Sequence, residues 1–502
     1  MADSIVDFDD VSFSYGTQTE GSLKHINLKI EEGECIVLTG QSGCGKTTIM
    51  RLINGLIPHF FEGSLTGCVK ILGKDTKTTS VGELGRNIAS IFQNPRSQFF
   101  TTNTTAEAAF ACENYGIERA EMIKGVDNAF YDFDAKCLMN RDMFSLSSGE
   151  KQKIAIIAAK TLNPNIYVFD EPSANLDIHA IMQLQEMIRK LREAGHTVIV
   201  SEHRLFYLKN LCDRCFIMSN GNIVKELCKS DIENMNTADL TNYKLRTFNI
   251  EEIGLNRENK TEYERSDNIK LEIKKLSFSY KHSKKLLDNI NITAYAGETI
   301  AIIGQNGEGK TTLGKIIAGL LKSAHGRFFL DGKQVKQKEL YKSVYFVMQE
   351  SDYQLYSDSV LSELYVSSGL SSKRNTQKIE CIMKLLHIFA YKEKHPWALS
   401  GGQKQRVTIA AAMASNKSIL IFDEPTSGLD YENMKAVSKA INILSRQGTV
   451  NFVISHDLEF LSRVATRAVF IANGTIGESI SLKNNRDFRT VKDFLLRNGV
   501  AK

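Results

Sequence analysis

The chain has 502 residues, too many for a single hydrophobic core, so two or more domains are expected. Hydrophobic residues make up 42% and charged residues 24%, as in soluble globular proteins, and the net charge of +5 does not by itself indicate a nucleic-acid partner, so none is expected. No apolar run approaches the ~20 residues of a membrane-spanning helix, and no signal peptide is expected. Most of the nine cysteines lie in strand and helix patterns, which is typical of reduced cytosolic thiols. Cys212 and Cys215 form a lone C-x-x-C with no second pair, so a metal or redox site is not expected there.

The first motif in chain order is a glycine-rich segment between a predicted strand at residues 34–39 and a helical pattern. It fits the phosphate-loop pattern G-x-x-x-x-G-K-S/T, whose glycines let backbone amides approach phosphate oxygens. Lys46 is expected to neutralise the β- and γ-phosphates, and Thr47 to bind Mg²⁺. The alternative is a glycine-rich turn without a ligand. Nucleotide contacts are expected from Gly40, Gln41, Ser42, Gly43, Cys44, Gly45, Lys46, Thr47 and Thr48.

An apolar run at residues 165–171 ends in two acids, Asp170 and Glu171. Such a run predicts a strand buried on both faces, and its C-terminal end is where open α/β sheets bind ligands. We expect Asp170 to hold Mg²⁺ directly or through water, and Glu171 to polarise the attacking water. His203 follows another short strand pattern, where it either reaches the γ-phosphate or is structural. Charged residues that merely end a strand are the alternative for the acids.

The second half of the chain repeats these motifs in the same order. A second phosphate loop follows a predicted strand at residues 299–303. Because the same pattern occurs twice, each time after a predicted strand, a chance match is improbable. Tyr15 recurs as Tyr280, and each tyrosine could stack on an adenine ring or simply pack in its strand. In this copy Thr311 and Asp423 are expected at Mg²⁺, and Glu424 and His456 at the attacking water and γ-phosphate. The second loop comprises Gly304, Gln305, Asn306, Gly307, Glu308, Gly309, Lys310, Thr311 and Thr312.

The repeat also indicates where the domains end. A period this long means two similar domains rather than a solenoid, and the mixture of strand and helix patterns predicts an α/β nucleotide-binding fold. Between the copies, residues 229–268 are polar and charged, as in a linker with short helical pieces. We therefore expect a first domain at residues 1–230, a linker at 231–268 and a second domain at 269–502.

Two more repeated motifs suggest a family. Leu146-Ser147-Ser148-Gly149-Glu150 and Leu399-Ser400-Gly401-Gly402-Gln403 each precede a helical pattern, where a Ser-Gly turn offers an anion site. With the phosphate loops, the paired acids and the histidines, these segments resemble the signature sequences of the ATP-binding cassette family. The resemblance spans nearly the whole chain.

The resemblance implies an ATPase with ATP and Mg²⁺ as cofactors. It implies two tandem domains, each with a RecA-like parallel-sheet core, an antiparallel β subdomain and a helical subdomain that carries the signature. In this family the signature of one domain closes over the ATP bound to the other. Site one would join Lys46, Glu171 and His203 to the second signature, and site two would join the matching second-copy residues to the first signature. The nucleotide-binding signature residues would be Ser147, Gly149, Glu150, Ser400, Gly401, Gly402 and Gln403.

The first signature departs from the family pattern. Ser148 stands where glycine is usual, and Glu150 where glutamine is usual. A carboxylate near a γ-phosphate is repulsive unless it points away, so site two could be tuned differently. Because each copy keeps its lysine, glutamate and histidine, we expect two hydrolysis-competent sites.

A glutamine-containing loop narrows the resemblance. Residues 92–100 are similar to the Q-loop of energy-coupling factor transporters, which import vitamins and metal ions, and residues 348–356 keep the same spacing of two glutamines. Gln93 and Gln349 would then contact Mg²⁺ or the water and relay nucleotide state to a membrane subunit. The implied partners are a transmembrane coupling subunit and a substrate-binding membrane subunit, at the cytoplasmic face of the cell membrane. Phe99 and Phe100 would line the groove for the coupling helices, or pack in the core.

Three other interpretations remain open. A ribosome-acting translation factor with paired cassettes usually has a longer, strongly basic interdomain helix, whereas residues 229–268 are mixed in charge. A fused ATPase of a sugar importer normally carries extra residues in its second signature, and none are present here. A nucleotide-gated scaffold without catalysis would lack a catalytic acid. The presence of both Glu171 and Glu424 therefore argues against this interpretation.

Overall fold

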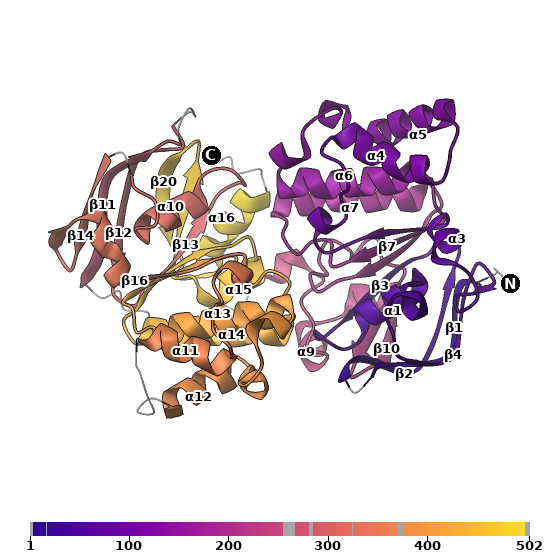
Figure 1. Cartoon of the computed structure of the whole chain (residues 1–502). Helices are drawn as coiled ribbons and strands as arrows, with labels where there is room; N and C mark the ends of the chain where they lie inside the picture. The colour runs from indigo at the N-terminus through magenta and orange to yellow at the C-terminus, as the bar shows by residue number, and fades with distance from the viewer. Residues whose placement is uncertain are drawn as a thin grey trace. The chain divides into compact units, whose positions relative to one another are not determined.

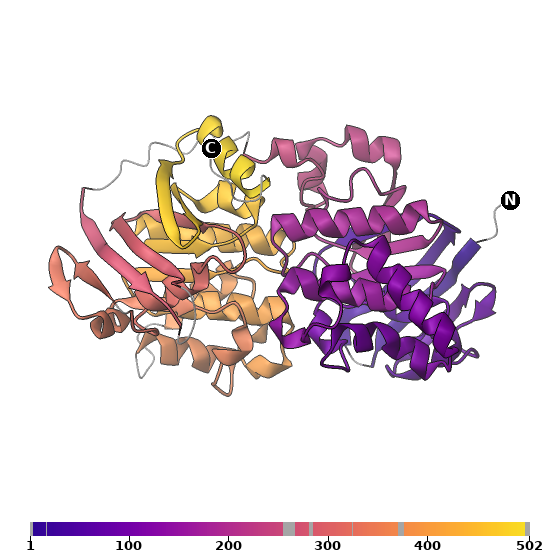
Figure 2. The ribbon, with the colours of Figure 1, turned by 90° about the horizontal axis from the view of Figure 1, so that it is seen from above.

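The computed structural model describes residues 4–16, 18–254, 267–280, 285–323, 325–369 and 376–496. The chain forms two compact units, Met1–Ile250 and Glu251–Lys502, and each unit is one continuous stretch of chain (Figures 1 and 2). In the described residues, no helix combines the length and the apolar character that crossing a membrane requires.

The centre of the first unit is a six-stranded sheet in the order β10-β9-β3-β8-β7-β6. Strands β6 to β9 and β3 are parallel, and β10 pairs antiparallel with β9. The alternating residues of β3 divide between two cores, because Ile36 packs with the helix after the strand and Val37 with the helices on the other face. The strands are β3 (Cys35–Gly40), β6 (Ile88–Ile91), β7 (Ile166–Asp170), β8 (Thr197–Ser201), β9 (Arg214–Ser219) and β10 (Asn222–Cys228).

A second, antiparallel sheet in the order β2-β1-β4-β5 packs against helix α1. Phe8 and Phe13 of this sheet join Ile49 and Leu52 of α1 in one core. The antiparallel subdomain expected from the family resemblance is therefore present. Its strands are β1 (Ser4–Tyr15), β2 (Gln18–Glu31), β4 (Ser64–Ile71) and β5 (Lys74–Asp75).

Helices complete the first unit, and Figure 1 shows α4 to α7 grouped beside the central sheet. Phe130 and Ile154 from this group lie in the core on that face of the sheet. The helices are α1 (Lys46–Ile53), α2 (Leu56–His59), α3 (Val81–Gly85), α4 (Thr104–Asn114), α5 (Arg119–Asp132), α6 (Ser148–Lys160), α7 (Ile178–Glu193), α8 (Lys229–Asn234) and α9 (Thr237–Asn242), with short 3-10 helices η1 (Pro95–Ser97), η2 (Lys136–Leu138) and η3 (Met143–Ser145).

The second unit repeats this architecture with sheets β16-β17-β18-β13-β19-β20 and β12-β11-β14-β15. Its strands are β11 (Ile269–Phe278), β12 (Leu287–Tyr295), β13 (Thr299–Ile303), β14 (His325–Leu330), β15 (Lys333–Val335), β16 (Val344–Val347), β17 (Ile419–Asp423), β18 (Val450–Ile454), β19 (Arg467–Ala472) and β20 (Thr475–Ser481). Its helices are α10 (Lys310–Ile317), α11 (Val360–Ser368), α12 (Thr376–Leu385), α13 (Gly401–Ala414), α14 (Tyr431–Arg446), α15 (Leu458–Val464) and α16 (Asn485–Leu496), with 3-10 helices η6 (Gln337–Lys342), η7 (Ser351–Tyr353), η9 (Phe389–Tyr391) and η10 (Pro396–Ala398).

The first unit extends beyond residue 230, where the polar composition placed its end. Helices α8 and α9 and the residues after them bury Ile232, Leu240, Leu245 and Phe248 in the core of the first unit. These apolar residues are widely spaced, which is why the stretch resembles a linker in sequence. The short helix η4 (Ile250–Glu252) spans the boundary between units, and residues 255–266 of the expected linker lie outside the described part of the chain.

Candidate nucleotide sites

The first phosphate loop connects β3 to α1 and depends on glycine geometry. Gly40 has a φ of 141°, and a Cβ there would lie 2.1 Å from the carbonyl oxygen of Met218. Gly45, with a φ of 109°, precedes α1 and has no side chain to cap the first amides of the helix. Those amides therefore remain directed at the loop, which suits an anion.

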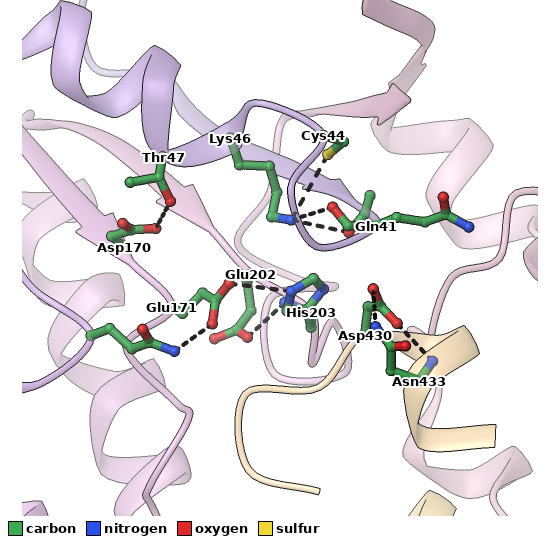
Figure 3. Close-up of polar contacts among 12 residues, drawn as sticks. Gln41, Cys44, Lys46, Thr47, Asp170, Glu171, Glu202, His203, Asp430 and Asn433 are labelled. Carbon is green, nitrogen blue, oxygen red and sulfur yellow. Dashed lines mark hydrogen bonds and ion pairs between the residues drawn. The ribbon is translucent and has the colours of Figure 1, made fainter. Parts of the chain in front are cut away.

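The loop lysine of each unit is buried and folds back over its own loop. Lys46 Nζ donates to the carbonyl oxygens of Gly40 at 3.1 Å and Gln41 at 3.0 Å, and lies 3.9 Å from Cys44 Sγ (Figure 3). Lys310 Nζ donates to the first two carbonyl oxygens of the second loop, at 2.7 and 2.8 Å. Each ammonium group thus stands within the loop, where it would neutralise phosphate.

The predicted Mg²⁺ ligands are neighbours in both units. Thr47 Oγ1 donates to Asp170 Oδ1 at 3.4 Å (Figure 3), and Thr311 Oγ1 to Asp423 Oδ2 at 2.8 Å. Burial raises the pKa of both aspartates, and the charge of Glu171 adds to the rise at Asp170. Within the described residues no cluster of three His, Cys, Asp or Glu could hold a metal alone. The donor set still fits Mg²⁺, which prefers hard oxygens and usually keeps phosphate and water ligands.

Glu171 follows β7 in a left-handed conformation, with a φ of 46°. Its Oε2 accepts a hydrogen bond from Gln93 Nε2 at 2.7 Å, and its Oε1 lies 3.2 Å from His203 Nε2 (Figure 3 shows the histidine). The structure therefore brings three predicted site residues together. Non-glycine residues seldom adopt positive φ, and such positions cluster at functional sites.

Glu424 has a φ of 48°, which repeats the backbone geometry of the first unit with different neighbours. Ser455 Oγ donates to Glu424 Oε2 at 3.3 Å, and Gln405 Nε2 donates to the Glu424 carbonyl oxygen at 2.6 Å. His456 Nε2 lies 3.8 Å from Glu424 Oε1. The two catalytic candidates are therefore held by different side chains.

Glu202 is a buried carboxylate that the motif comparison missed as a contributor to the site. Its Oε1 accepts from the backbone amides of His203 at 2.7 Å and Arg204 at 3.0 Å. Its Oε2 accepts from the Ser173 amide at 3.3 Å and the Tyr207 hydroxyl at 2.9 Å. Glu202 thus ties the histidine to the loop after Glu171. The sequence signal for this role was an acid directly after a buried strand.

The second unit has its buried acid on the other side of the histidine. Asp457 Oδ2 accepts from Thr426 Oγ1 at 2.9 Å, and its Oδ1 from the Phe460 amide at 3.1 Å. Both units therefore use a carboxylate to join the same two loops, at positions that differ in the sequence.

Tyr15 and Tyr280 lie beside the helices that follow the phosphate loops. The Tyr15 hydroxyl is 3.2 Å from Thr48 Oγ1 and accepts from Arg51 Nη1 at 3.0 Å. The Tyr280 hydroxyl is 3.2 Å from Thr312 Oγ1. Stacking of either ring on adenine remains a prediction. The Thr48 hydroxyl donates to the Gly21 carbonyl oxygen at 2.6 Å, so it already has an acceptor within the protein.

The signatures begin helices α6 and α13, and both start with reciprocal hydrogen bonds between a serine and the residue three positions after it. Ser147 pairs with Glu150, and Ser400 with Gln403. A Cβ on Gly149 would lie 2.9 Å from the Cβ of Ala180 in α7, so this glycine allows the two helices to approach. Sequence reasoning placed both motifs at helix starts, as the structure has them.

The second glutamine of each Q-loop fixes the loop to its strand. Gln98 Oε1 accepts from the Phe92 amide at 3.2 Å, and its Nε2 donates to the Ser90 carbonyl oxygen at 3.0 Å. Phe99 packs against the core, whereas Phe100 is 74% exposed and stacks on Phe110 with ring centroids 4.8 Å apart. Core packing therefore describes Phe99, whereas a place for Phe100 in a groove for coupling helices stays a prediction.

Comparison with known proteins agrees with this geometry. A family model described as ABC transporter matches residues 23–174 and 287–427, which contain both phosphate loops and both pairs of acids. The chain belongs to the ABC transporter ATPase family. This ABC ATPase hydrolyses ATP with Mg²⁺, as members of the family do.

Relatives and solved structures match this ABC ATPase over nearly its whole length. A Treponema denticola protein, provisionally named an ABC transporter ATP-binding protein, is 37% identical and covers 96% of this chain and 98% of its own. A Caldanaerobacter subterraneus protein with the same kind of name is 30% identical, over 95% of this chain and 91% of its own. The archaeal ribosome recycling factor aABCE1, solved with a ribosomal stalk protein, has a TM-score of 0.66 over 98% of this chain and 93% of its own. At 23% identity, that likeness shows a shared fold alone.

Proposed function

We propose that this ABC ATPase is the energy-coupling subunit of an importer of the energy-coupling factor type, which takes up vitamins or metal ions. In this proposal it lies at the cytoplasmic face of the membrane and binds a transmembrane coupling subunit and a substrate-binding membrane subunit. ATP binds at two composite sites, each completed by the signature of the other half. Nucleotide binding favours the closed pair of halves, and hydrolysis adds charge that favours opening.

The observation that carries the proposal is the contact between the Q-loop and the catalytic candidate. Gln93 donates to Glu171 at one end of the loop, and the exposed ring of Phe100 stands at the other end. Glu107, a buried residue of α4, accepts from the Phe100 and Thr101 amides at 3.0 and 2.8 Å and so fixes the aromatic end. A partner that pressed on Phe100 would therefore act on a loop that touches the acid.

The second unit repeats these fixed points. Gln354 links the Met348 amide and the Phe346 carbonyl oxygen, and Glu363 accepts from the Tyr356 and Ser357 amides. The ring of Tyr356 is exposed, as that of Phe100 is. Two similar aromatic contact points suit a pair of coupling helices presented by a transmembrane subunit.

The proposed chemistry assigns a role to each side chain that recurs in the two sites. The loop lysine holds the phosphates, and the threonine and first acid hold Mg²⁺, which supplies charge neutralisation when bound. The second acid accepts a proton from the attacking water, and the histidine beside it contacts the γ-phosphate. Gln93 and Gln349 report the state of the site to the loop surface.

The membrane role is tested with Phe100→Ser, which removes the exposed ring. The full chain is expressed in its native cells and purified from their membranes. We expect copurifying integral membrane proteins to fall about tenfold while basal ATP hydrolysis stays within about twofold, because loss of an aromatic contact buried by the partner costs ~1.4 kcal/mol or more. Tyr131→Ser on α5 is the matched control, an exposed aromatic outside the Q-loop segment. Cosedimentation with ribosomes, with no membrane partner, would favour the translation-factor alternative.

Equal competence of the two sites is tested by Glu171→Gln and Glu424→Gln separately. We expect each replacement to reduce turnover strongly, because each removes the proton acceptor of one site. If one replacement abolishes turnover and the other leaves it untouched, only one site is competent.

A further inference from the structure

The first signature contains a carboxylate, Glu150, that is hydrogen-bonded to the serine of the same motif. The backbone amide and the hydroxyl of Ser147 both donate to Glu150 Oε2 at 2.8 Å, and Arg141 Nη1 donates to Glu150 Oε1 at 2.8 Å. Glu150 therefore binds the serine through one oxygen and the arginine through the other. Partial burial acts to raise the pKa of Glu150, but the hydrogen bonds from Ser147 and Arg141 outweigh it and lower this pKa. The carboxylate is consequently charged at neutral pH.

The second signature has the same backbone geometry with a neutral partner. The Ser400 amide donates to Gln403 Oε1 at 3.0 Å, and the Gln403 amide donates to Ser400 Oγ at 3.4 Å. In the position that corresponds to Arg141, the Lys394 ammonium lies over the ring of Tyr391 at 5.2 Å. The two signatures thus share their fold and differ in charge at one residue and its counter-ion.

This difference bears on anion binding at the start of α6. A phosphate approaching Ser147 must displace a charged carboxylate from both donors of the serine, and it meets the like charge of Glu150. At the start of α13, the phosphate competes with the neutral amide oxygen of Gln403 for the Ser400 amide. Arg141 reduces the repulsion and also holds the carboxylate in place.

We propose that Glu150, held by Arg141, is a positioning residue that occupies the first signature and weakens ATP binding at site two relative to site one. The inference rests on the proposed pairing in which the first signature completes the site of Lys310. It assigns the two halves unequal roles, with site one filling first and site two closing last.

The chain offers a matched pair of reporters. Trp397, the single tryptophan, is 70% exposed two residues before the second signature, and Phe144 occupies the corresponding place before the first signature with 81% exposure. Trp397 therefore reports on closure at the second signature, and the Phe144→Trp/Trp397→Phe variant reports on the first. Both are read in the full chain with Glu171→Gln and Glu424→Gln, so that Mg-ATP is bound without turnover.

We compare the dissociation constant of Mg-ATP measured with Trp397 in the parent chain and with the first-signature reporter in the Phe144→Trp/Trp397→Phe variant. The first-signature reporter should give a dissociation constant about tenfold higher, a difference of ~1.4 kcal/mol. Glu150→Gln should tighten the weaker dissociation constant about tenfold, and Gln403→Glu should weaken the other. Arg141→Gln should change the dissociation constant of site two only while Glu150 is present, which a merely structural role of Arg141 would not produce.

Three outcomes decide the matter. An unchanged dissociation constant at the first signature in Glu150→Gln, with thermal unfolding intact, would overturn the proposal. Loss of the first-signature signal in Lys310→Ala supports the crossed pairing. If Lys46→Ala removes that signal instead, the crossed pairing itself is wrong, whereas a missing membrane partner would leave the binding result unaffected.

Discussion

Replacing Glu202 with glutamine tests whether this buried carboxylate stabilises the first unit. Glutamine keeps one oxygen for the amides of His203 and Arg204. Its NH₂ group, however, would face the Ser173 amide, so two donors would meet in a buried place. An unsatisfied buried donor costs about 1–3 kcal/mol, and hydrogen bonds to a charged acceptor are stronger than those to a neutral one. We expect a loss of about 2–4 kcal/mol from the free energy of unfolding.

The assay is urea unfolding of the full chain with hydrogen exchange read on peptides from residues 166–177 and 197–208, because a two-domain chain does not unfold in one step. Burial and the nearby charge of Glu202 raise the pKa of Tyr207 well above its usual range, so its hydroxyl remains a donor. Tyr207→Phe removes only that donor and should cost about 1.5 kcal/mol. Asp457→Asn should affect exchange in the second unit alone.

The reasoning fails if Glu202→Gln unfolds within about 0.5 kcal/mol of the parent chain, the range of an ordinary surface substitution. It also fails if Tyr207→Phe costs more than Glu202→Gln, because the carboxylate would then not be the centre of the network.

Two other replacements test the geometry of the phosphate site. Gly40→Ala should lower the free energy of unfolding in urea by more than about 3 kcal/mol, because its Cβ would collide with the Met218 carbonyl oxygen. Gly73 also has a positive φ but open space around it, so Gly73→Ala should cost only about 1 kcal/mol. Equal costs would contradict the steric argument. Asp170→Asn should raise the stability of the nucleotide-free protein at pH 7 and abolish Mg²⁺-dependent hydrolysis. The pKa of Asp170 is raised in the folded protein. The free energy of unfolding is therefore unaffected by this group below its pKa in the unfolded chain, and it falls as pH rises from there through the pKa in the folded protein. The gain in stability from asparagine should accordingly vanish near about pH 3. A gain that grows on acidification would contradict this sign.

The phosphate loops and strand-end acids were predictable because their chemistry is written in contiguous residues. Lys46 bonds to carbonyl oxygens of its own loop, and Asp170 ends a strand whose apolar run is visible in the sequence. The structure confirms the α/β fold with two ATPase units. Glu202 was missed because its partner Ser173 lies 29 residues away, and the second unit places its acid after the histidine instead.

The end of the first unit was harder to predict for a related reason. Ile232 and Phe248 are buried by a fold that forms around them, and their own neighbours in sequence are polar. Local composition cannot show such burial. The aromatic pair of the Q-loop is a similar case, since only the packing of α4 separates a core Phe99 from an exposed Phe100.

The positive φ of Glu171 and Glu424 sets stability against activity at two places in the chain. Glycine adopts this conformation freely, so Glu171→Gly would relieve roughly 1 kcal/mol of backbone strain while removing the acid. A laboratory selection for heat resistance alone should therefore recover glycine at these positions, and a selection that also demands ATP turnover should reject it. At these two acids, ATP turnover and the local preference of the backbone therefore require different residues.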